Sequence, residues 1–244
     1  MRKYYIIGAG PGDPNLLTIR AMKAIAESDL ILTDSLVPDE ILVSTCTGKR
    51  VVHVGHRATR DHSGVMERIS AVLDHVEFSV ASHLKEGDPS VFSHLYEEIQ
   101  MLIERNIAYE VVPGVSSAIA VPEIAGLVLT ARGRSESFLV VSASDASGRF
   151  NERAIRSAIN SVEPIVIMMG SRYLGKIRDL LISMYYEGPV VIIENGTRPD
   201  QRVTVYRDAK GIATNEARMP AIIVVGHVVM VNDVVERNEN RIRN

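Results

Sequence analysis

A glycine-rich segment near the amino terminus has the residue types of a ligand-binding loop. It reads Gly8-Ala9-Gly10-Pro11-Gly12-Asp13-Pro14 and lies between the apolar run Tyr4–Ile7 and a helical pattern over Leu16–Glu27. A strand that ends in glycines and leads into a helix is a common ligand site in open α/β sheets. Pro11 removes a backbone N–H that a phosphate would use, and the Asp13 carboxylate would repel a phosphate. The loop therefore predicts close backbone approach to a ligand without phosphates.

Composition excludes several classes of function. The net charge of −3 gives no general attraction to nucleic acid or to an anionic membrane. The single cysteine, Cys46, cannot form an intrachain disulfide and fits a reducing compartment. No apolar stretch reaches membrane-spanning length, and no spacing among the histidines resembles a metal site. We expect a cytoplasmic protein without a metal, and without nucleic-acid or membrane partners.

Short β-rich runs alternate with helical patterns, which predicts two α/β domains. The first half predicts a mainly parallel sheet flanked by helices. In the second half several strands are separated only by short turns, which indicates a mixed sheet with antiparallel members. Pro113-Gly114 separates the halves, so we expect domains at residues 1–114 and 115–244. The predicted strands cover residues 4–7, 30–32, 51–54, 78–81, 109–112, 138–142, 165–168, 190–193, 202–205 and 221–225, and the main predicted helices cover 16–27, 65–73, 95–104 and 115–125.

Eight short motifs occur in a fixed order along nearly the whole chain. Together they resemble the tetrapyrrole (precorrin) methylase family, although each alone is weak. The first reads I-G-A-G-P-G-D-P-N-L-L-T, and the third reads K-E-G-D-P-S-V-F. The motifs lie at Ile7–Thr18, Thr33–Val37, Lys85–Phe92, Val111–Ala118, Gly126–Arg132, Met168–Gly170, Glu194–Val203 and Pro220–Gly226.

The resemblance implies S-adenosyl-L-methionine as the cofactor, bound in a trough between two α/β domains, and a homodimer as the assembly. A sulfonium cation without phosphates tolerates the acidic residues Asp13 and Asp88 near its site. Glycines in the first and third motifs permit close backbone approach to the cofactor. By position in the family motifs, the resemblance implies that the cofactor contacts are Pro11, Glu86, Gly87, Asp88, Val91, Ser116, Ser117, Met169, Gly196 and Ala221.

The resemblance also implies a C-methyltransferase that converts uroporphyrinogen III to precorrin-2, in sirohaem and cobalamin biosynthesis. Methylation of a pyrrole carbon requires loss of a proton, and Asp34 occupies the family's acidic position as the expected general base. The substrate's acetate and propionate arms would bind arginine forks. The candidate anchors are Arg57, Arg60, Arg132 and Arg134.

Several departures from the family pattern leave alternatives open. His56 stands where the uroporphyrinogen enzymes have a lysine that is a proposed proton donor, and histidine can also donate a proton. Glu86 replaces a glycine, and the arginine and glycines that usually follow Phe92 are absent. A methyltransferase for a later intermediate, such as cobalt-precorrin-4 C11-methyltransferase, or a non-catalytic cofactor-binding paralogue remains open. A nicotinamide-dependent oxidoreductase is disfavoured by Pro11 and Asp13. Structural roles are expected for His75, His83, His94 and His227.

Overall fold

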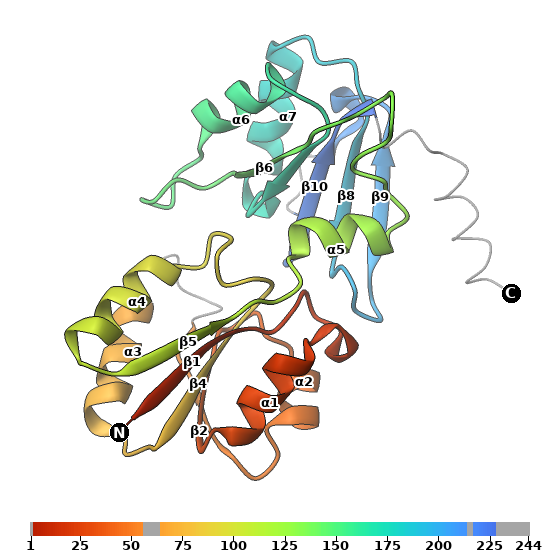
Figure 1. Ribbon diagram of the computed structural model, residues 1–244. Coiled ribbons are helices and arrows are strands. Elements are labelled where there is room, and N and C mark those ends of the chain that lie inside the picture. Colours follow the sequence, from red (N-terminus) through yellow and green to blue (C-terminus); the bar gives the residue numbers. More distant parts are fainter. Residues whose placement is uncertain (1, 56–63, 214–216, 228–244) are drawn as a thin grey trace, which may run out of the picture. The chain divides into compact units, whose positions relative to one another are not determined.

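The computed structural model describes residues 2–55, 64–213 and 217–227 (Figure 1). Internal contacts divide the chain into two compact units, Met1–Ser117 and Ala118–Asn244. The division falls just after the expected one at residues 114 and 115. Each unit contains a five-stranded sheet with its own hydrophobic core.

The sheet of the first unit is parallel throughout, with the strand order β3-β2-β4-β1-β5. Four helices connect its strands (Figure 1). The strands are β1 (Lys3–Gly8), β2 (Leu30–Thr33), β3 (Arg50–His53), β4 (Val80–Lys85) and β5 (Ala108–Val112). The helices are α1 (Ile19–Glu27), α2 (Asp39–Thr45), α3 (Gly64–His75) and α4 (Leu95–Glu104), and the 3-10 turn η1 covers Pro14–Leu16.

Both faces of this sheet are covered, which is the usual reason for nearly continuous apolar strands. Ile7 packs on one side, in a cluster with Ile25 of α1 and Ile41 of α2. Its neighbour Ile6 packs on the other side, in a cluster that contains Ile69 of α3. Alternate residues of one strand therefore contribute to two separate apolar layers.

Strand β4 and helix α1 differ most from the predicted ranges in the first unit. Strand β4 continues to Lys85, whereas the predicted strand ends at Ala81, because His83 and Lys85 are polar and interrupt the apolar run. Helix α1 begins only at Ile19, after Thr18 caps it by accepting a hydrogen bond from the backbone N–H of Ala21. Helix α2 lies outside the predicted helices.

The second unit contains a mixed sheet in the order β6-β7-β10-β8-β9. Strands β6 and β7 are parallel, whereas β10 is antiparallel to β7 and β8, and β8 is antiparallel to β9. The α/β fold class, with a parallel first sheet and a mixed second sheet, is therefore confirmed. The elements are α5 (Ser117–Ile124), β6 (Leu139–Ser142), α6 (Glu152–Ile159), β7 (Ile165–Met168), η2 (Ser171–Tyr173), α7 (Leu174–Ser183), β8 (Val190–Glu194), β9 (Arg202–Tyr206), η3 (Ala209–Gly211) and β10 (Ala221–Val225).

Helices also cover both faces of the second sheet. Ile155 of α6 and Ile177 of α7 join the core on one face. Val121 of α5 packs against the other face, in a cluster with Val191 and Ile222. Helices α6 and α7 lie outside the main predicted helices.

Candidate functional site

The loops that follow β1 and β4 are joined at the carboxyl edge of the first sheet. The backbone N–H of Ala9 donates to the Lys85 carbonyl at 2.8 Å. Gly10 and Gly87 then form an isolated bridge, with N–H···O distances of 3.2 and 2.8 Å in the two directions. Ligands of open parallel sheets bind outside the carboxyl ends of the strands, so this junction lies where a ligand is expected.

The loop after β5 meets this junction through glycines. A Cβ atom on Gly114 would lie 2.3 Å from the Gly87 carbonyl oxygen and 2.6 Å from Gly8 Cα. A Cβ atom on Gly8 would lie 2.5 Å from Gly114 Cα. Gly87 also has a φ of +72°, in the left-handed region that favours glycine. Contact between three backbones therefore requires glycine at these positions.

Asp88 ties two of these loops together. Its Oδ2 atom accepts the Gly114 N–H at 3.0 Å, and its Oδ1 atom accepts the Ser90 N–H at 2.8 Å. The structure thus shows that Asp88 braces the loop, while a contact between Asp88 and cofactor remains a prediction. The predicted cofactor contacts of this unit all lie on the three joined loops and the start of α5: Pro11, Glu86, Gly87, Asp88, Val91, Ser116 and Ser117.

Asp34 lies at the same edge, because β2 is the neighbour of β4 in the sheet. Its backbone N–H donates to the Leu84 carbonyl at 3.0 Å, and 26% of its side chain is exposed. The loop after β3 packs on it from the other side. A Cβ atom on Gly55 would lie 2.3 Å from Ser35 N and 3.0 Å from Asp34 Cα. Gly55 therefore fixes the backbone from which the Asp34 side chain extends.

We expect Gly55→Ala to lower kcat by about 10-fold or more while cofactor affinity is retained, because a small displacement of a reacting group has a large effect on rate. Steady-state kinetics and calorimetric titration measure the two quantities. Gly48→Ala is the matched control in the preceding turn. Its Cβ would meet nothing within 4 Å, but its φ of +77° strains the fold, so stability should fall without loss of kcat. An unchanged kcat in Gly55→Ala would contradict this role for the glycine.

A buried polar cluster stands behind Asp34. His83 Nε2 lies 3.2 Å from Asp34 Oδ1, and His83 Nδ1 lies 2.7 Å from Glu98 Oε1. Glu98 Oε1 also accepts the Tyr4 hydroxyl at 3.0 Å, and Glu98 Oε2 accepts Lys85 Nζ at 2.9 Å. Tyr4, His83 and Glu98 are fully buried, and Lys85 is almost fully buried. Buried charges need partners, and these side chains provide them for one another.

The cluster changes the acidity of its members. Burial alone would raise the pKa of Glu98, but the charges of His83 and Lys85 lower it to about 2. Burial would also raise the pKa of Asp34, and His83 holds it below its usual value instead. Burial would lower the pKa of His83, but Glu98 and then Asp34 raise it above its usual value. The cluster thus favours the charged forms of all three groups.

Glu98→Gln should destabilise the fold by about 3 kcal/mol at neutral pH, because it leaves buried cations without their carboxylate. Since the folded-state pKa of Glu98 is lowered to about 2, its contribution is full above the usual pKa of a glutamate and is lost as the pH falls toward 2. Urea unfolding across this acid range should show a steeper loss for the wild type than for the variant. Glu104→Gln, at an exposed position of the same helix, should leave both stability and its pH dependence nearly unchanged. Equal slopes for wild type and Glu98→Gln would contradict the assignment.

Three predicted cofactor contacts of the second unit lie at one edge of its sheet. Because β10 is antiparallel to β7 and β8, its first residue Ala221 lies where those strands end. Met169 directly follows β7 with a φ of +55° and is 40% exposed. Gly196 follows β8, and a Cβ atom there would lie 2.3 Å from Val121 Cγ1. These residues share an edge, and their contact with cofactor remains a prediction.

The predicted substrate residues are only partly described. Arg132 and Arg134 are exposed on a tight turn, which is closed by backbone hydrogen bonds of 2.9 and 2.8 Å between Ala131 and Ser135. The positions His56, Arg57 and Arg60 lie outside the described residues.

Three functional candidates escaped sequence reasoning: His83 as a partner of Asp34, and Lys85 and Glu98 as partners of His83 and of each other. The sequence carries one signal for them. His83 and Lys85 alternate with apolar residues in a strand, and two adjacent acidic residues, Glu97 and Glu98, lie in the first turn of the next helix. Alternation places His83 and Lys85 on one face of the sheet, where a buried position demands an acidic partner.

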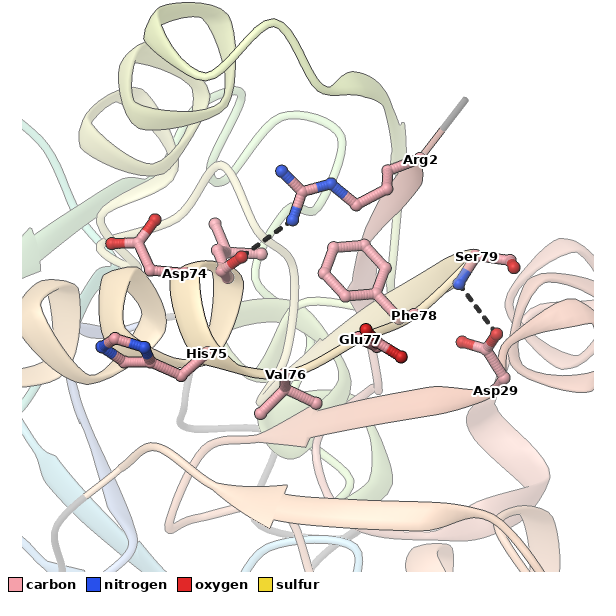
Figure 2. A pocket seen from close by; sticks show the side chains of 9 residues that line it. Arg2, Asp29, Asp74, His75, Val76, Glu77, Phe78 and Ser79 are labelled. Carbon is pink, nitrogen blue, oxygen red and sulfur yellow. Dashed lines mark hydrogen bonds between the residues drawn. The ribbon is translucent and has the colours of Figure 1, made fainter.

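A surface hollow lies at the opposite edge of the first sheet. It is lined by Arg2, Asp29 and Phe78, which precede β1, β2 and β4 (Figure 2). Arg2 donates to the Leu73 carbonyl at 2.8 Å, and its guanidinium lies 5.2 Å from the centre of the Phe78 ring. Asp29 accepts the Ser79 N–H at 2.9 Å (Figure 2). The side chains of Arg2 and Asp29 are therefore already engaged by neighbouring groups. The hollow lies at the amino ends of the strands, whereas ligands of parallel sheets bind at the carboxyl ends, so we interpret it as a structural feature.

Comparison with known proteins decides the family. A family model described as Tetrapyrrole (Corrin/Porphyrin) Methylases matches residues 3–208. The chain is a tetrapyrrole methylase. This methylase is 40% identical over 239 residues to uroporphyrinogen-III C-methyltransferase of Methanocaldococcus jannaschii, which covers 95% of this chain and 98% of that protein.

Two further comparisons agree on the family. The S-adenosyl-L-methionine-dependent uroporphyrinogen III methyltransferase of Methanosarcina barkeri is 36% identical, over 96% of this chain and 94% of that protein. A crystal structure of uroporphyrin-III C-methyl transferase from Thermus thermophilus, complexed with S-adenosylhomocysteine, superimposes with a TM-score of 0.78 at 31% identity. The match covers 94% of both chains. Within the part of this methylase that the structure describes, no helix is long and apolar enough to cross a membrane.

Proposed function

We propose that this tetrapyrrole methylase is an S-adenosylmethionine-dependent C-methyltransferase that converts uroporphyrinogen III to precorrin-2. The observation that carries the proposal is the carboxyl edge of the first sheet. Three glycine-braced loops there lie on the same edge as Asp34, which projects from the neighbouring strand β2. The substrate assignment follows relatives that are 36–40% identical over nearly their whole length and are named for this activity.

The residues present fit a cofactor that has a sulfonium and no phosphates. Pro11 offers no N–H to a phosphate, and Asp13 uses its carboxylate to accept the Asn15 N–H at 2.8 Å. The joined loops present backbone rather than bulky side chains, as close approach to a ligand requires. We propose that the predicted contacts of the first unit hold the cofactor, with Met169, Gly196 and Ala221 of the second unit as further contacts.

S-adenosylmethionine, when bound, supplies the methyl group. Transfer of this group to a ring carbon of the substrate would break the methyl–sulfur bond and leave its electron pair on sulfur. The ring then carries the positive charge that sulfur loses, and it becomes neutral by giving up a proton. Asp34, held as a carboxylate, stabilises this charge and accepts the proton.

Arginines would orient the substrate by its carboxylate arms, because a guanidinium pairs bidentately with a carboxylate. Arg132 and Arg134 are exposed and available for this role, and Arg57 and Arg60 are proposed with them. His56 is proposed as a proton donor in place of the family's lysine. The proposal also includes a homodimer, which light scattering after gel filtration would test, and a cytoplasmic location.

The first experiment mixes the purified protein anaerobically with S-adenosylmethionine and uroporphyrinogen III. We expect release of S-adenosylhomocysteine and a tetrapyrrole product heavier by two methyl groups. Cofactor binding without product would overturn the substrate assignment, and cobalt-precorrin-4 would then be the next substrate to test. Binding of NADH in place of S-adenosylmethionine would overturn the methyltransferase assignment altogether.

A further inference from the structure

The buried cluster behind Asp34 brings together side chains from three different elements. Tyr4 comes from β1, His83 and Lys85 come from β4, and Glu98 comes from α4. These groups lie in the layer between the sheet and helices α3 and α4, where the neighbouring side chains are apolar. The cluster extends from this layer to the exposed edge of the sheet through the contact between His83 and Asp34.

The hydrogen bonds of the cluster determine the charge of His83. Glu98 accepts hydrogen bonds from the Tyr4 hydroxyl and from the Lys85 ammonium, and the charge of Lys85 beside it keeps it ionised, so Glu98 can only accept. Asp34 lies partly in solvent, where a carboxylate is also ionised at neutral pH. His83 has one ring nitrogen within hydrogen-bonding distance of each carboxylate. Both nitrogens must carry a proton to make both bonds, and a ring with two such protons is an imidazolium.

We propose that His83, held as an imidazolium between Glu98 and Asp34, is a positioning residue that fixes the Asp34 carboxylate for the methyl transfer. This inference rests on the function proposed above. His83 does not touch the reacting atoms and acts through Asp34. Glu98 in turn holds the imidazolium in place, while Lys85 supplies the second cation that balances the two carboxylates.

The arrangement has two effects on Asp34. The hydrogen bond from Nε2 fixes one carboxylate oxygen, so the side chain loses rotational freedom before substrate arrives. The positive charge on the ring also keeps Asp34 ionised to a lower pH than an ordinary aspartate. A neutral side chain at position 83 would provide neither effect in full.

The kinetic test uses His83→Gln, which keeps a hydrogen-bond donor but removes the charge. We expect kcat to fall about 10- to 100-fold with KM and cofactor affinity unchanged, because the reacting group is misplaced while the binding loops are intact. The acid limb of the pH–rate profile should also move to higher pH, since Asp34 loses its cationic neighbour. A wild-type kcat and pH profile would overturn the proposal.

Ser82→Ala is the matched control, on the same strand and pointing to the opposite face. Ser82 Oγ lies 2.6 Å from Ser28 Oγ, so the variant also loses a buried hydrogen bond. It should lower stability and leave kcat and the pH profile unchanged. If kcat fell as much in Ser82→Ala as in His83→Gln, the loss of any buried hydrogen bond on this strand would lower kcat by destabilising the fold. That result would overturn the specific role of His83.

A double variant separates a positioning role from a structural one. If His83 acts through Asp34, then Asp34→Asn with His83→Gln should be no slower than Asp34→Asn alone. Rate losses that multiply would overturn the proposal.

A spectroscopic readout is independent of the reaction. Nitrogen chemical shifts of His83 in the wild-type protein should report an imidazolium at neutral pH, and Glu98→Gln should shift them toward a neutral ring. A neutral His83 in the wild type would overturn the charge assignment even if the enzyme were active. If no tetrapyrrole were methylated but the imidazolium were observed, the proposed function would fail while the cluster assignment stood.

Discussion

Gly114→Ala should weaken binding of S-adenosylmethionine by about 100-fold, which corresponds to about 2.7 kcal/mol. The added Cβ would lie 2.3 Å from the Gly87 carbonyl oxygen and 2.6 Å from Gly8 Cα, and both are backbone atoms. Neither can rotate away as a flexible side chain would, so the loops after β1, β4 and β5 must separate. The Gly114 N–H that Asp88 accepts at 3.0 Å would move with them. Isothermal titration calorimetry measures the change in affinity.

Gly175→Ala provides the control for this substitution. It lies in α7, and a Cβ atom there would meet nothing within 4 Å. We expect unchanged affinity and an equal or slightly higher Tm, because alanine favours a helix over glycine by about 1 kcal/mol. Wild-type affinity in a folded Gly114→Ala protein would remove the three-loop junction from the cofactor site.

Asp34→Asn should reduce kcat by about 100- to 10,000-fold, the usual contribution of a general base. The asparagine keeps the size of the side chain and can still accept the hydrogen bond from His83, so the backbone should not move. Affinity for S-adenosylmethionine should stay near that of the wild type, because the joined glycine loops are untouched. Single-turnover methyl transfer with saturating cofactor measures the chemical step directly.

Asp39→Asn is the control for Asp34→Asn, because it removes the same negative charge at a nearby exposed position in the first turn of α2. It should leave kcat unchanged. If Asp34→Asn were as active as Asp39→Asn, then Asp34 would be a structural turn residue, and the base would have to be sought elsewhere on the same edge of the sheet.

The two predictions test separate parts of one edge. The glycine junction is formed by backbone, and we expect it to support binding. Asp34 and its buried partners are side chains, and we expect them to support the chemical step. A defect confined to affinity in one variant and to kcat in the other would show that the two functions are separable, although the backbone N–H groups of Asp34 and Ala9 both donate to carbonyls of β4.

Local patterns in the sequence were sufficient for most of the fold. The strands at Ile165–Met168 and Ala221–Val225 follow from uninterrupted apolar runs bounded by turn residues, and their predicted limits match the structure. The parallel first sheet follows from the alternation of strands and helices. The prediction was wrong at β4, which was expected to end at Ala81 and continues to Lys85. An apolar run does not show where a strand ends when the strand continues through buried polar residues.

The sequence by itself determined the chemical character of the candidate site: glycines for close backbone contact, a proline and an aspartate that disfavour phosphate, and Asp34 after the second strand. These features depend on residues close together in the chain, so spacing reveals them. Only the tertiary structure decided that Gly114 meets Gly8 and that His83 joins Asp34 to Glu98, in residues far apart in the sequence. The order of parallel strands creates these contacts, and a buried charge becomes tolerable only when its partner arrives from another element. Pairing between distant residues leaves no periodic pattern in the sequence. For this reason the sequence predicts only a structural role for His83, and the contact of His83 with both Asp34 and Glu98 is seen only in the structure.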